Sequence, residues 1–471
     1  MTSRADVGFR SERGPILIAI MMATGLVAID ATILATAITS IVGDLGGFAQ
    51  FPWLFSIYLL AQAVSVPIYA KLSEVLGRKP IIIFGIALFL LGSILCGLAW
   101  SMPALIAFRA VQGLGAGAVQ PTAITIVGDI YTIAERAQVQ GYLASVWAIS
   151  SVVGPTLGGL FSEFLSWRWI FFINIPLCIV AGWMIMRTLH ERIEPRAHRV
   201  DYLGAVLLTS SLSLLILGIL EGGQSWAWDS PLSIGAFVVG GLLLGCFVLA
   251  ETRAAEPILP LWVFSRRLLL TTALVGLGVG AILIGLTSYV PTYLEGSLEV
   301  SPLVAGLALA ALTIGWPISA SLSGRFYLRI GFRNTALIGM VVVVSGAVIL
   351  AAFAGEPNLV TVAASCFLIG LGLGLVATPT LIAAQSSVEW NQRGVVTGAS
   401  LFSRSIGSAI GVAIFGAVAN GIFAASGGSG TDAETITTAS SAVFLAVVIA
   451  AAATVVAVVA MPRTPAQGSR A

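Results

Sequence analysis

The sequence predicts an all-α polytopic membrane protein, and two observations carry this prediction. The first is composition: 58% of the 471 residues are hydrophobic and 9% are charged, whereas soluble domains carry about 25% charged residues. The mean hydropathy is accordingly high, at +1.01. The second is the length of the apolar runs, because a helix needs about 20 apolar residues to cross the hydrocarbon core. The sequence contains fourteen such runs.

These runs define the expected helices in order. The first, from Pro15 to about Ile41, is too long for the apolar core of a signal peptide and lacks a clear cleavage site, so we expect it to remain as a spanning helix. The thirteenth, from Val395 to about Ala424, is long enough to contain a break. The fourteen runs begin near Pro15, Pro52, Pro80, Pro103, Gln138, Trp169, Tyr202, Pro231, Leu268, Ser301, Asn334, Leu359, Val395 and Ser440.

The distribution of basic residues tests this count, because Lys and Arg accumulate in short cytoplasmic connectors. With the amino terminus inside the cell, 20 of the 23 basic residues fall on the cytoplasmic side. Arg168 falls outside, and Arg109 and Arg404 fall within helices. A missed helix would reverse the bias partway along the chain. We therefore expect fourteen helices, both termini in the cytoplasm and a location in the plasma (inner) membrane.

The chain also contains an internal repeat. A shift of 257 residues aligns Arg136 with Arg393, and three glycines that follow Arg136 with glycines of the second half. Parallel repeats around a central site are a known transporter layout. We expect an amino-terminal six-helix bundle at 1–190, a connector with two extra spanning helices at 191–267, and a carboxy-terminal six-helix bundle at 268–471.

Three charged residues lie within the apolar segments. Arg109 has no counter-charge in its own segment, and Asp30 is the one carboxylate well inside a span. Charges at membrane depth are costly and mark functional sites. At about 1.5 Å per residue, Asp30 and Arg109 can lie at similar depths, which predicts an ion-coupled transport site. The third, Arg404, needs a partner, either a backbone carbonyl or Asp30, and its role stays open between a structural and a coupling one.

The connector after the second run carries a cluster of charges on a glycine turn. It reads AKLSEVLGRKP from Ala70 to Pro80 and includes Glu74, Gly77, Arg78 and Lys79. A carboxylate and two cations on a tight turn can bridge two bundles in one state and release them in another. The alternative is plain anchoring by positive charge on the cytoplasmic side.

Further motifs follow along the first half. Arg109 is followed by Gln112 and Gly113, and the first run contains Ile29-Asp30-Ala31-Thr32. The fifth run contains Gly154, Pro155, Gly158 and Gly159, where glycines permit close helix contact and proline frees a backbone carbonyl. The alternative for these glycines is generic helix packing. Residues 167–176 read WRWIFFINIP.

Together these motifs resemble those of the fourteen-helix drug:proton antiporters of the major facilitator superfamily. The residues from Ala70 to Pro80 resemble the cytoplasmic loop signature of that superfamily, with Ala70 in place of glycine and Glu74 in place of aspartate. The resemblance implies the major facilitator fold, with two six-helix bundles and two extra central helices. It also implies that Arg109 takes part in proton transfer and that the glycine–proline motif is that of drug exporters.

Asp30 and Arg109 are the expected proton-coupling residues. Beside the guanidinium, Asp30 would be ionised and could attract a cationic substrate. Separated from it in an apolar cavity, Asp30 would take up a proton, because desolvation disfavours the charged form. The alternative for Asp30 is a structural hydrogen bond within the bundle.

Substrate contacts follow from the aromatic and amide side chains within the spans. Aromatic faces can bind flat apolar cations, although most aromatics in spans face lipid or fill helix interfaces. The candidate substrate-binding residues are Tyr58, Gln62, Gln112, Trp147, Tyr289, Tyr293, Trp316, Phe402 and Arg404.

The expected function is proton-coupled export of lipophilic, often cationic, drugs by alternating access. A same-fold exporter of a lipid, siderophore or metabolite is the alternative, and sodium coupling stays open. A channel or receptor is disfavoured because the longest connectors have about fifteen residues. We expect no enzyme activity, because no catalytic constellation accompanies the buried charges. We also expect no cofactor, no metal site and no nucleic-acid partner; the partners are small lipophilic molecules, protons and the bilayer, and the protein is expected to be a monomer.

Overall fold

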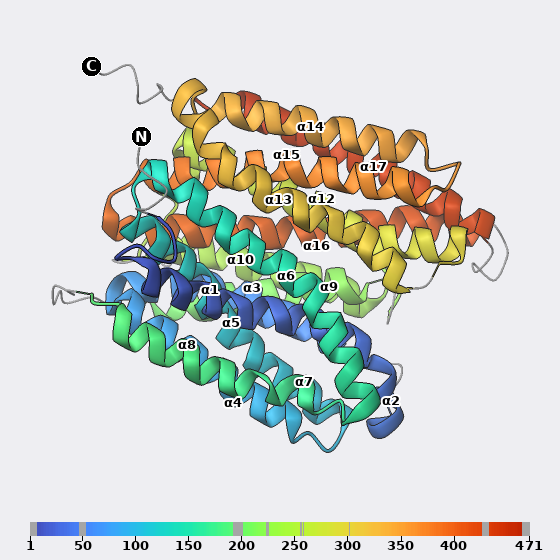
Figure 1. Ribbon diagram of the computed structural model, residues 1–471, viewed down its shortest axis with the longest axis horizontal. Helices are drawn as coiled ribbons and strands as arrows, with labels where there is room; N and C mark the ends of the chain where they lie inside the picture. Colours follow the sequence, from blue (N-terminus) through green and yellow to red (C-terminus); the bar gives the residue numbers. More distant parts are fainter. Residues whose placement is uncertain are drawn as a thin grey trace.

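The computed structural model describes residues 7–46, 53–191, 201–222, 226–254, 257, 259–300, 302–425 and 433–463, and helices account for most of them. Figure 1 shows these helices as two groups that lie side by side. The helices are α1 (Gly14–Ile33), η2 (Leu34–Ala37), α2 (Ile38–Leu45), α3 (Trp53–Leu76), α4 (Arg78–Gly97), α5 (Met102–Ile130), α6 (Ile133–Phe164), α7 (Trp169–Phe172), α8 (Asn174–Thr188), α9 (Tyr202–Glu221), α10 (Pro231–Glu251), α11 (Trp262–Ser265), α12 (Arg267–Leu298), α13 (Pro302–Ile330), α14 (Phe332–Ala352), α15 (Leu359–Ser386), η4 (Trp390–Gln392), α16 (Arg393–Ala425) and α17 (Ala433–Ala460).

Within these described residues, thirteen helices are long and apolar enough to cross a membrane. The remaining expected helix is α9, whose apolar part Leu203–Ile219 is shorter. The chain is therefore a multi-pass membrane protein. Most expected helix starts agree with the structure to within two residues, but α6 begins at Ile133 rather than near Gln138, and α17 begins at Ala433 rather than near Ser440.

The structure corrects one expectation about helix continuity and decides one open question. The first run is interrupted, because the 3₁₀ turn Leu34–Ala37 separates α1 from α2. That turn lies against α6. The thirteenth run has no break, since α16 is continuous from Arg393 to Ala425.

Each half has its own apolar core. The core of the amino-terminal half is formed by α1, α4, α5, α6 and α8, with Leu17, Phe89 and Val127 almost completely buried. The core of the carboxy-terminal half is formed by α12 to α17, with Ile282, Val343 and Phe444 buried. Two bundles of spanning helices, with α9 and α10 between them in sequence, agree with the architecture that the sequence predicts.

The halves meet along two helix pairs, α3 with α16 and α6 with α13. The helix α9 packs against both α3 and α16, and α10 packs against α9. Figure 1 shows the two groups lying together toward the end where the chain termini lie and spreading apart toward the other end. We call the end at which α1 begins and α17 ends the basic end, because Arg78, Arg136 and Arg393 lie there.

Close packing of α4 on α5 positions the polar groups described below. A Cβ atom at Gly92 would lie 2.6 Å from the backbone of Gln112, and one at Gly115 would lie 2.4 Å from the backbone nitrogen of Phe89. Both glycines therefore allow an approach that no larger residue permits.

The variant Gly115→Ala should lower the melting temperature of the purified protein in detergent, because its methyl group would meet the backbone of α4. Overpacking of this kind costs about 1–3 kcal/mol. Gly241→Ala is the matched control, since Gly241 lies in α10 with no atom within 4 Å of its Cβ position. The two variants can be compared by circular dichroism, and equal melting temperatures would contradict this packing.

Candidate functional site

Asp30 and Arg109 form a buried ion pair inside the amino-terminal half. Asp30 lies near the end of α1 and Arg109 in the first third of α5. The Arg109 Nη1 atom donates to Asp30 Oδ2 at 2.6 Å, and each side chain is 1% exposed. The prediction that the two lie at similar depths therefore agrees with the structure.

A network of neutral polar groups surrounds this pair. Gln112 Nε2 donates to Asp30 Oδ1 at 2.7 Å, and Asn174 Nδ2 lies 3.4 Å from the same oxygen. Both amide groups also donate to Ser93 Oγ, at 2.7 and 3.1 Å. Four helices, α1, α4, α5 and α8, thus contribute to one buried network.

Arg109 is held by further groups of α3. Its Nε atom donates to the Leu54 carbonyl at 3.2 Å, and its guanidinium carbon lies 4.2 Å from the centre of the Tyr58 ring. Its Nη1 atom also donates to Gln112 Oε1 at 2.6 Å. Removing one partner of such a buried pair costs about 3–5 kcal/mol, because the other charge loses its compensation.

The structure assigns Gln112 and Tyr58 to this network, although the sequence placed them among substrate-binding candidates. Both are almost completely buried within the amino-terminal half. Sequence reasoning missed Ser93 and Asn174. Asn174 could have been found, because it is an amide within the otherwise apolar stretch FFINIP.

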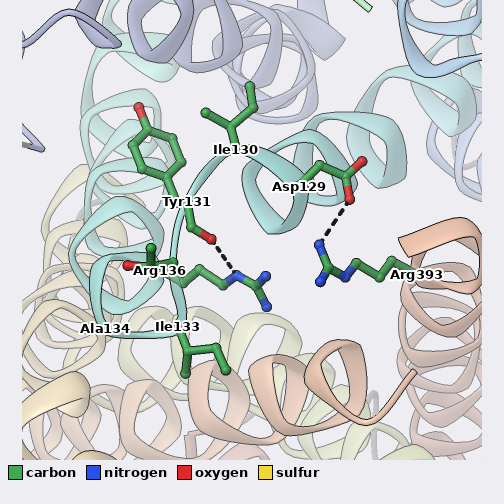
Figure 2. A pocket seen from close by; sticks show the side chains of 8 residues that line it. Asp129, Ile130, Tyr131, Ile133, Ala134, Arg136 and Arg393 are labelled. Carbon is green, nitrogen blue, oxygen red and sulfur yellow. Dashed lines mark hydrogen bonds and ion pairs between the residues drawn. The ribbon is translucent and has the colours of Figure 1, made fainter. Parts of the chain in front are cut away.

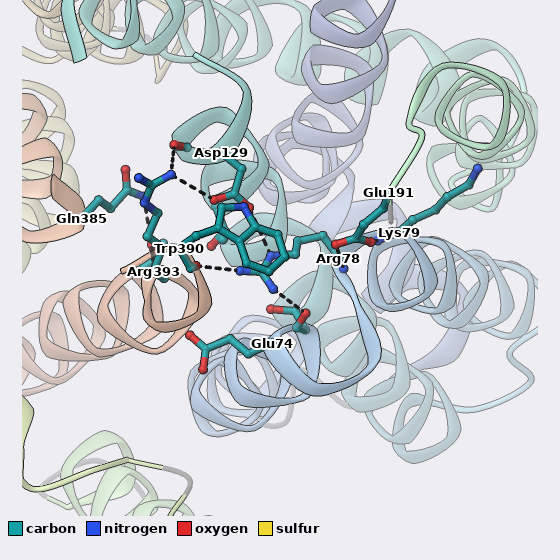
Figure 3. Close-up of polar contacts among 12 residues, drawn as sticks. Glu74, Arg78, Lys79, Asp129, Glu191, Gln385, Trp390 and Arg393 are labelled. Atoms are coloured by element: carbon teal, nitrogen blue, oxygen red, sulfur yellow. Dashed lines mark hydrogen bonds and ion pairs between the residues drawn. The ribbon is translucent and has the colours of Figure 1, made fainter. Parts of the chain in front are cut away.

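The residues of the 70–80 connector contact the other half at the basic end, as Figure 3 shows. Gly77 has φ 96° and forms the turn before α4, and Gly331 has φ 84° at the equivalent turn before α14. Glu74 accepts a hydrogen bond from the Val395 backbone nitrogen of α16 at 2.7 Å. This carboxylate thus lies at the amino-terminal end of a helix of the other half, where its charge is favoured.

Arg78 is buried between the halves. Its Nε atom donates to Asp129 Oδ2 at 3.1 Å, and its Nη2 atom donates to the Trp390 carbonyl at 3.2 Å. Its guanidinium carbon also lies 4.1 Å from the centre of the Trp390 ring. Asp129 in turn accepts from Arg393 of α16 at 3.4 Å.

Lys79 takes no part in these contacts between the halves. Its Nζ atom donates to the Met186 carbonyl at 2.8 Å, and Glu191 accepts from the backbone nitrogens of Arg78 and Lys79. The predicted bridging cluster is thus made by Glu74 and Arg78, together with Asp129, Trp390 and Arg393. The sequence had not singled out Asp129, Trp390 or Glu191.

The glycine–proline motif lies where α6 crosses α1. A Cβ atom at Gly154 would lie 2.1 Å from Thr32 Oγ1, so only glycine fits this crossing. Gly158 is buried, whereas a Cβ atom at Gly159 would meet nothing within 4 Å. Pro155 lies in the helix, and its side chain is outside the described residues. Thr32 Oγ1 donates to the Ser150 carbonyl at 2.9 Å, which joins the two helices directly.

The 167–176 run closes the opposite end of this half. Arg168 Nη1 donates to Asp44 Oδ2 at 2.7 Å, and the Trp167 indole nitrogen donates to the same oxygen at 3.0 Å. The hydrogen bond from Arg168 lowers the pKa of Asp44, with a smaller contribution from Trp167. Arg168, which the charge distribution placed outside the cell, is therefore paired with Asp44 of α2.

The remaining substrate-binding candidates are dispersed. Gln62 of α3 donates to Gln120 of α5 at 2.9 Å. Tyr293 lies in the carboxy-terminal core, where it is 1% exposed and its hydroxyl donates to the Ala354 carbonyl. Phe402 packs with α3 and α9 residues. Trp147, Tyr289 and Trp316 are half-buried beside the cores of their own halves.

The expected partner of Arg404 is corrected. Asp30 is not the partner, because its carboxylate accepts hydrogen bonds from Arg109, Gln112 and Asn174. Arg404 itself is half-buried in α16, and no hydrogen bond or ion pair of its side chain is found with the described residues. Its backbone lies against Gly276 and Gly280 of α12.

This arrangement agrees with comparisons with known proteins. The family model described as the Major Facilitator Superfamily matches residues 20–412. The chain belongs to the major facilitator superfamily.

Relatives within this superfamily carry names of drug transporters. The chain is 34% identical over 413 residues to the multidrug transporter protein MdtP of Bacillus subtilis, covering 88% of this chain and 76% of that protein. It is 34% identical over 408 residues to multidrug resistance protein 3 of the same organism, covering 87% and 80%. The efflux pump FUS6 of Gibberella fujikuroi is 30% identical, covering 86% of this chain and 75% of the pump.

Solved structures show the same fold. The human organic anion transporter MFSD10 matches with a TM-score of 0.66 and 17% identity, covering 93% of this chain and 99% of that one. The proton:xylose symporter XylE matches with a TM-score of 0.63 and 11% identity, covering 92% and 94%. This member of the major facilitator superfamily is therefore a membrane transporter and not an enzyme, and the resemblance stated from its motifs is confirmed.

In this major facilitator protein, Arg393→Gln should loosen the contact between the halves at the basic end, because it removes charge-assisted hydrogen bonds to Asp129 and Gly128. The reporter is Ala137→Cys, in a protein whose four cysteines are replaced by alanine, since Ala137 is 1% exposed and faces Gly324. Maleimide labelling of this cysteine should accelerate roughly tenfold, as a charge-assisted bond contributes about 1.5–3 kcal/mol.

Arg325→Gln is the matched control for this experiment. It removes the same charge from an exposed position near the same end of the molecule. If both variants label at the wild-type rate, Arg393 does not hold the halves together.

Proposed function

We propose that this transporter exports lipophilic, often cationic, drugs in exchange for protons, with both termini in the cytoplasm of the cell and the protein in the plasma membrane. The buried pair of Asp30 and Arg109 is the observation that carries the proposal. Export of drugs is supported by the names of the relatives. The cytoplasmic placement of the basic end is supported by the positive-inside rule.

The chemistry of coupling rests on Asp30. With the Arg109 guanidinium 2.6 Å from its Oδ2 atom, the Asp30 carboxyl group has its counter-charge within the bundle. When the pair opens, Asp30 lies in a low-dielectric site without its counter-charge, and uptake of a proton relieves the cost of that burial. Restoring the pair expels the proton. Gln112, Asn174 and Ser93 orient the carboxylate, and they can hydrogen-bond to its neutral form as well.

The two states differ in which end of the molecule is open. In the present structure Glu74, Arg78 and Arg393 bind groups of the opposite half at the basic end. Breaking these contacts opens the basic end and exposes the interface of the halves to the cytoplasm. Substrate would enter there and leave at the opposite end.

Two hydrogen bonds, linked by neighbouring residues of the chain, connect the surroundings of Asp30 to the other half. Thr32, two residues from Asp30, donates to the Ser150 carbonyl of α6. The neighbouring Ser151 hydroxyl lies 3.2 Å from the Thr313 hydroxyl of α13. Movement of α13 against α6 therefore reaches α1 next to the proton-binding carboxylate.

The same fold also serves the alternative, export of a lipid, siderophore or metabolite, and the coupling mechanism would be unchanged. Dye efflux from inverted vesicles separates proton from sodium coupling. Efflux driven by an imposed pH gradient supports the proposal, and efflux driven by a sodium gradient alone contradicts it.

Asp30→Asn should abolish substrate-induced proton release, because the amide cannot exchange a proton. The measurement uses purified protein in a weakly buffered detergent solution with a pH-sensitive dye, to which a lipophilic cation such as ethidium is added. Wild type should release protons on binding, and the variant should release none.

The control separates coupling from stability, because Arg109 is left unpaired in Asp30→Asn. The double variant Asp30→Asn, Arg109→Gln removes both charges and should recover much of the melting temperature. It should still release no protons. Proton release from either variant at the wild-type level would overturn the role of Asp30.

Thr32→Val should reduce drug efflux in vesicles roughly tenfold while ethidium binding persists, because it removes one hydrogen bond between α1 and α6 at similar volume. Thr156→Val is the matched control, since the exposed Thr156 hydroxyl donates within its own helix, to the Val152 carbonyl. Equal efflux by both variants would exclude the proposed path.

A further inference from the structure

A shallow pocket of about 490 Å³ opens at the basic end, where the halves meet. It is lined by Arg393 at the start of α16 and by residues from the end of α5 to the first turn of α6: Asp129, Ile130, Tyr131, Thr132, Ile133, Ala134 and Arg136. Figure 2 shows the guanidinium groups of Arg136 and Arg393 pointing toward each other across this pocket.

The two arginines are equivalent positions of the internal repeat, separated by 257 residues. Both donate to one carbonyl, that of Gly128: Arg136 through Nη2 and Arg393 through Nη1. Arg136 also donates through Nε to the Tyr131 carbonyl at 3.0 Å. The repeat thus brings one cation from each half to the same point.

Each arginine retains a buried donor without an acceptor. Arg136 is 4% exposed, and its Nη1 atom has no hydrogen-bond partner among the described residues. The Nε atom of Arg393 is likewise buried without a partner in this part of the chain. Unsatisfied buried donors of charged groups are costly, so a native structure rarely leaves two of them together.

The nearby carboxylates also provide too little negative charge to pair with both arginines of the pocket. Asp129 is shared between Arg78 and Arg393. Glu135, which precedes Arg136, is bound by both terminal nitrogens of Arg13. Arg78 and Arg393 therefore share one carboxylate, and Arg136 donates only to backbone carbonyls among the described residues.

We propose that this pocket binds a phosphate-type anion, which bridges Arg136 of one half and Arg393 of the other and holds the basic end closed. A tetrahedral phosphate offers several strong acceptor oxygens, and guanidinium groups match it through paired N–H donors. The anion is either free inorganic phosphate or the phosphate of an anionic lipid headgroup. Its binding favours the closed basic end because the two arginines belong to different halves.

The experiment uses the full chain with the Ala137→Cys reporter, in detergent, with inorganic phosphate replacing chloride at constant ionic strength. Phosphate should slow maleimide labelling of Cys at position 137 roughly tenfold, through new charge-assisted hydrogen bonds. Arg136→Gln should lose this protection. Arg325→Gln, the exposed control, should retain it.

A second variant keeps both arginines and so guards against misfolding of Arg136→Gln. Ala134→Glu introduces a carboxylate into the pocket lining. This carboxylate takes the place of the anion beside the two arginines. Labelling of this variant should be slow without phosphate and should not respond to it.

A second experiment, in lipid nanodiscs, distinguishes the two sources of phosphate. The reporter protein is placed in nanodiscs of phosphatidylcholine, with or without phosphatidylglycerol. Protection by phosphatidylglycerol but not by inorganic phosphate identifies a headgroup site, and protection by inorganic phosphate identifies a site for the free ion.

The proposal is overturned if neither protects, or if Arg136→Gln or Ala134→Glu responds like wild type. Labelling does not require export, so this result is independent of the proposed drug–proton exchange.

Discussion

The ion pair between Asp30 and Arg109 is the interaction on which the amino-terminal half depends. Neither charge can remain in a membrane interior alone, and each is 1% exposed. Their neutralisation therefore dictates that α1 and α5 lie side by side at this depth. Ser93 of α4 and Asn174 of α8 complete the network, and Gly92 allows α4 to approach Gln112 closely enough for this. The network around one pair of charges thus joins four helices.

Buried charges also need partners at the basic end, but there the partners come from the other half. There the charges of Glu74 and Arg78 are neutralised or hydrogen-bonded by groups of the opposite half, so their burial depends on the relative position of the halves. A contact that satisfies a buried charge in one arrangement leaves it unsatisfied or hydrated in the other. Interfaces of this kind favour two discrete arrangements over a continuum, which is what the proposed alternation between two open ends requires.

The sequence predicted the parts of this structure that depend on composition and on spacing along one helix. The helix count, the glycine turn at Gly77 and the pairing of Asp30 with Arg109 follow from hydropathy and from the cost of buried charge. It could not predict partners that are set by packing between distant helices. Asn174 is 144 residues from Asp30 in the sequence, and Asp129 is 51 residues from Arg78. The sequence also did not indicate that the Tyr293 hydroxyl donates to the Ala354 carbonyl inside the carboxy-terminal core.

The crossing of α1, α6 and α13 explains how a buried pair inside one half can respond to the other half. Thr32 bonds to Ser150, and Ser151 meets Thr313, so adjacent residues of α6 bind two helices on different sides. Glycine at 154 brings α1 and α6 into backbone contact, which leaves little room for independent movement. A tilt of α6 against α13 must then either carry α1 along or break the Thr32 bond. In both cases the position of Asp30 relative to Arg109 changes, and the proposed coupling to protons depends on that change.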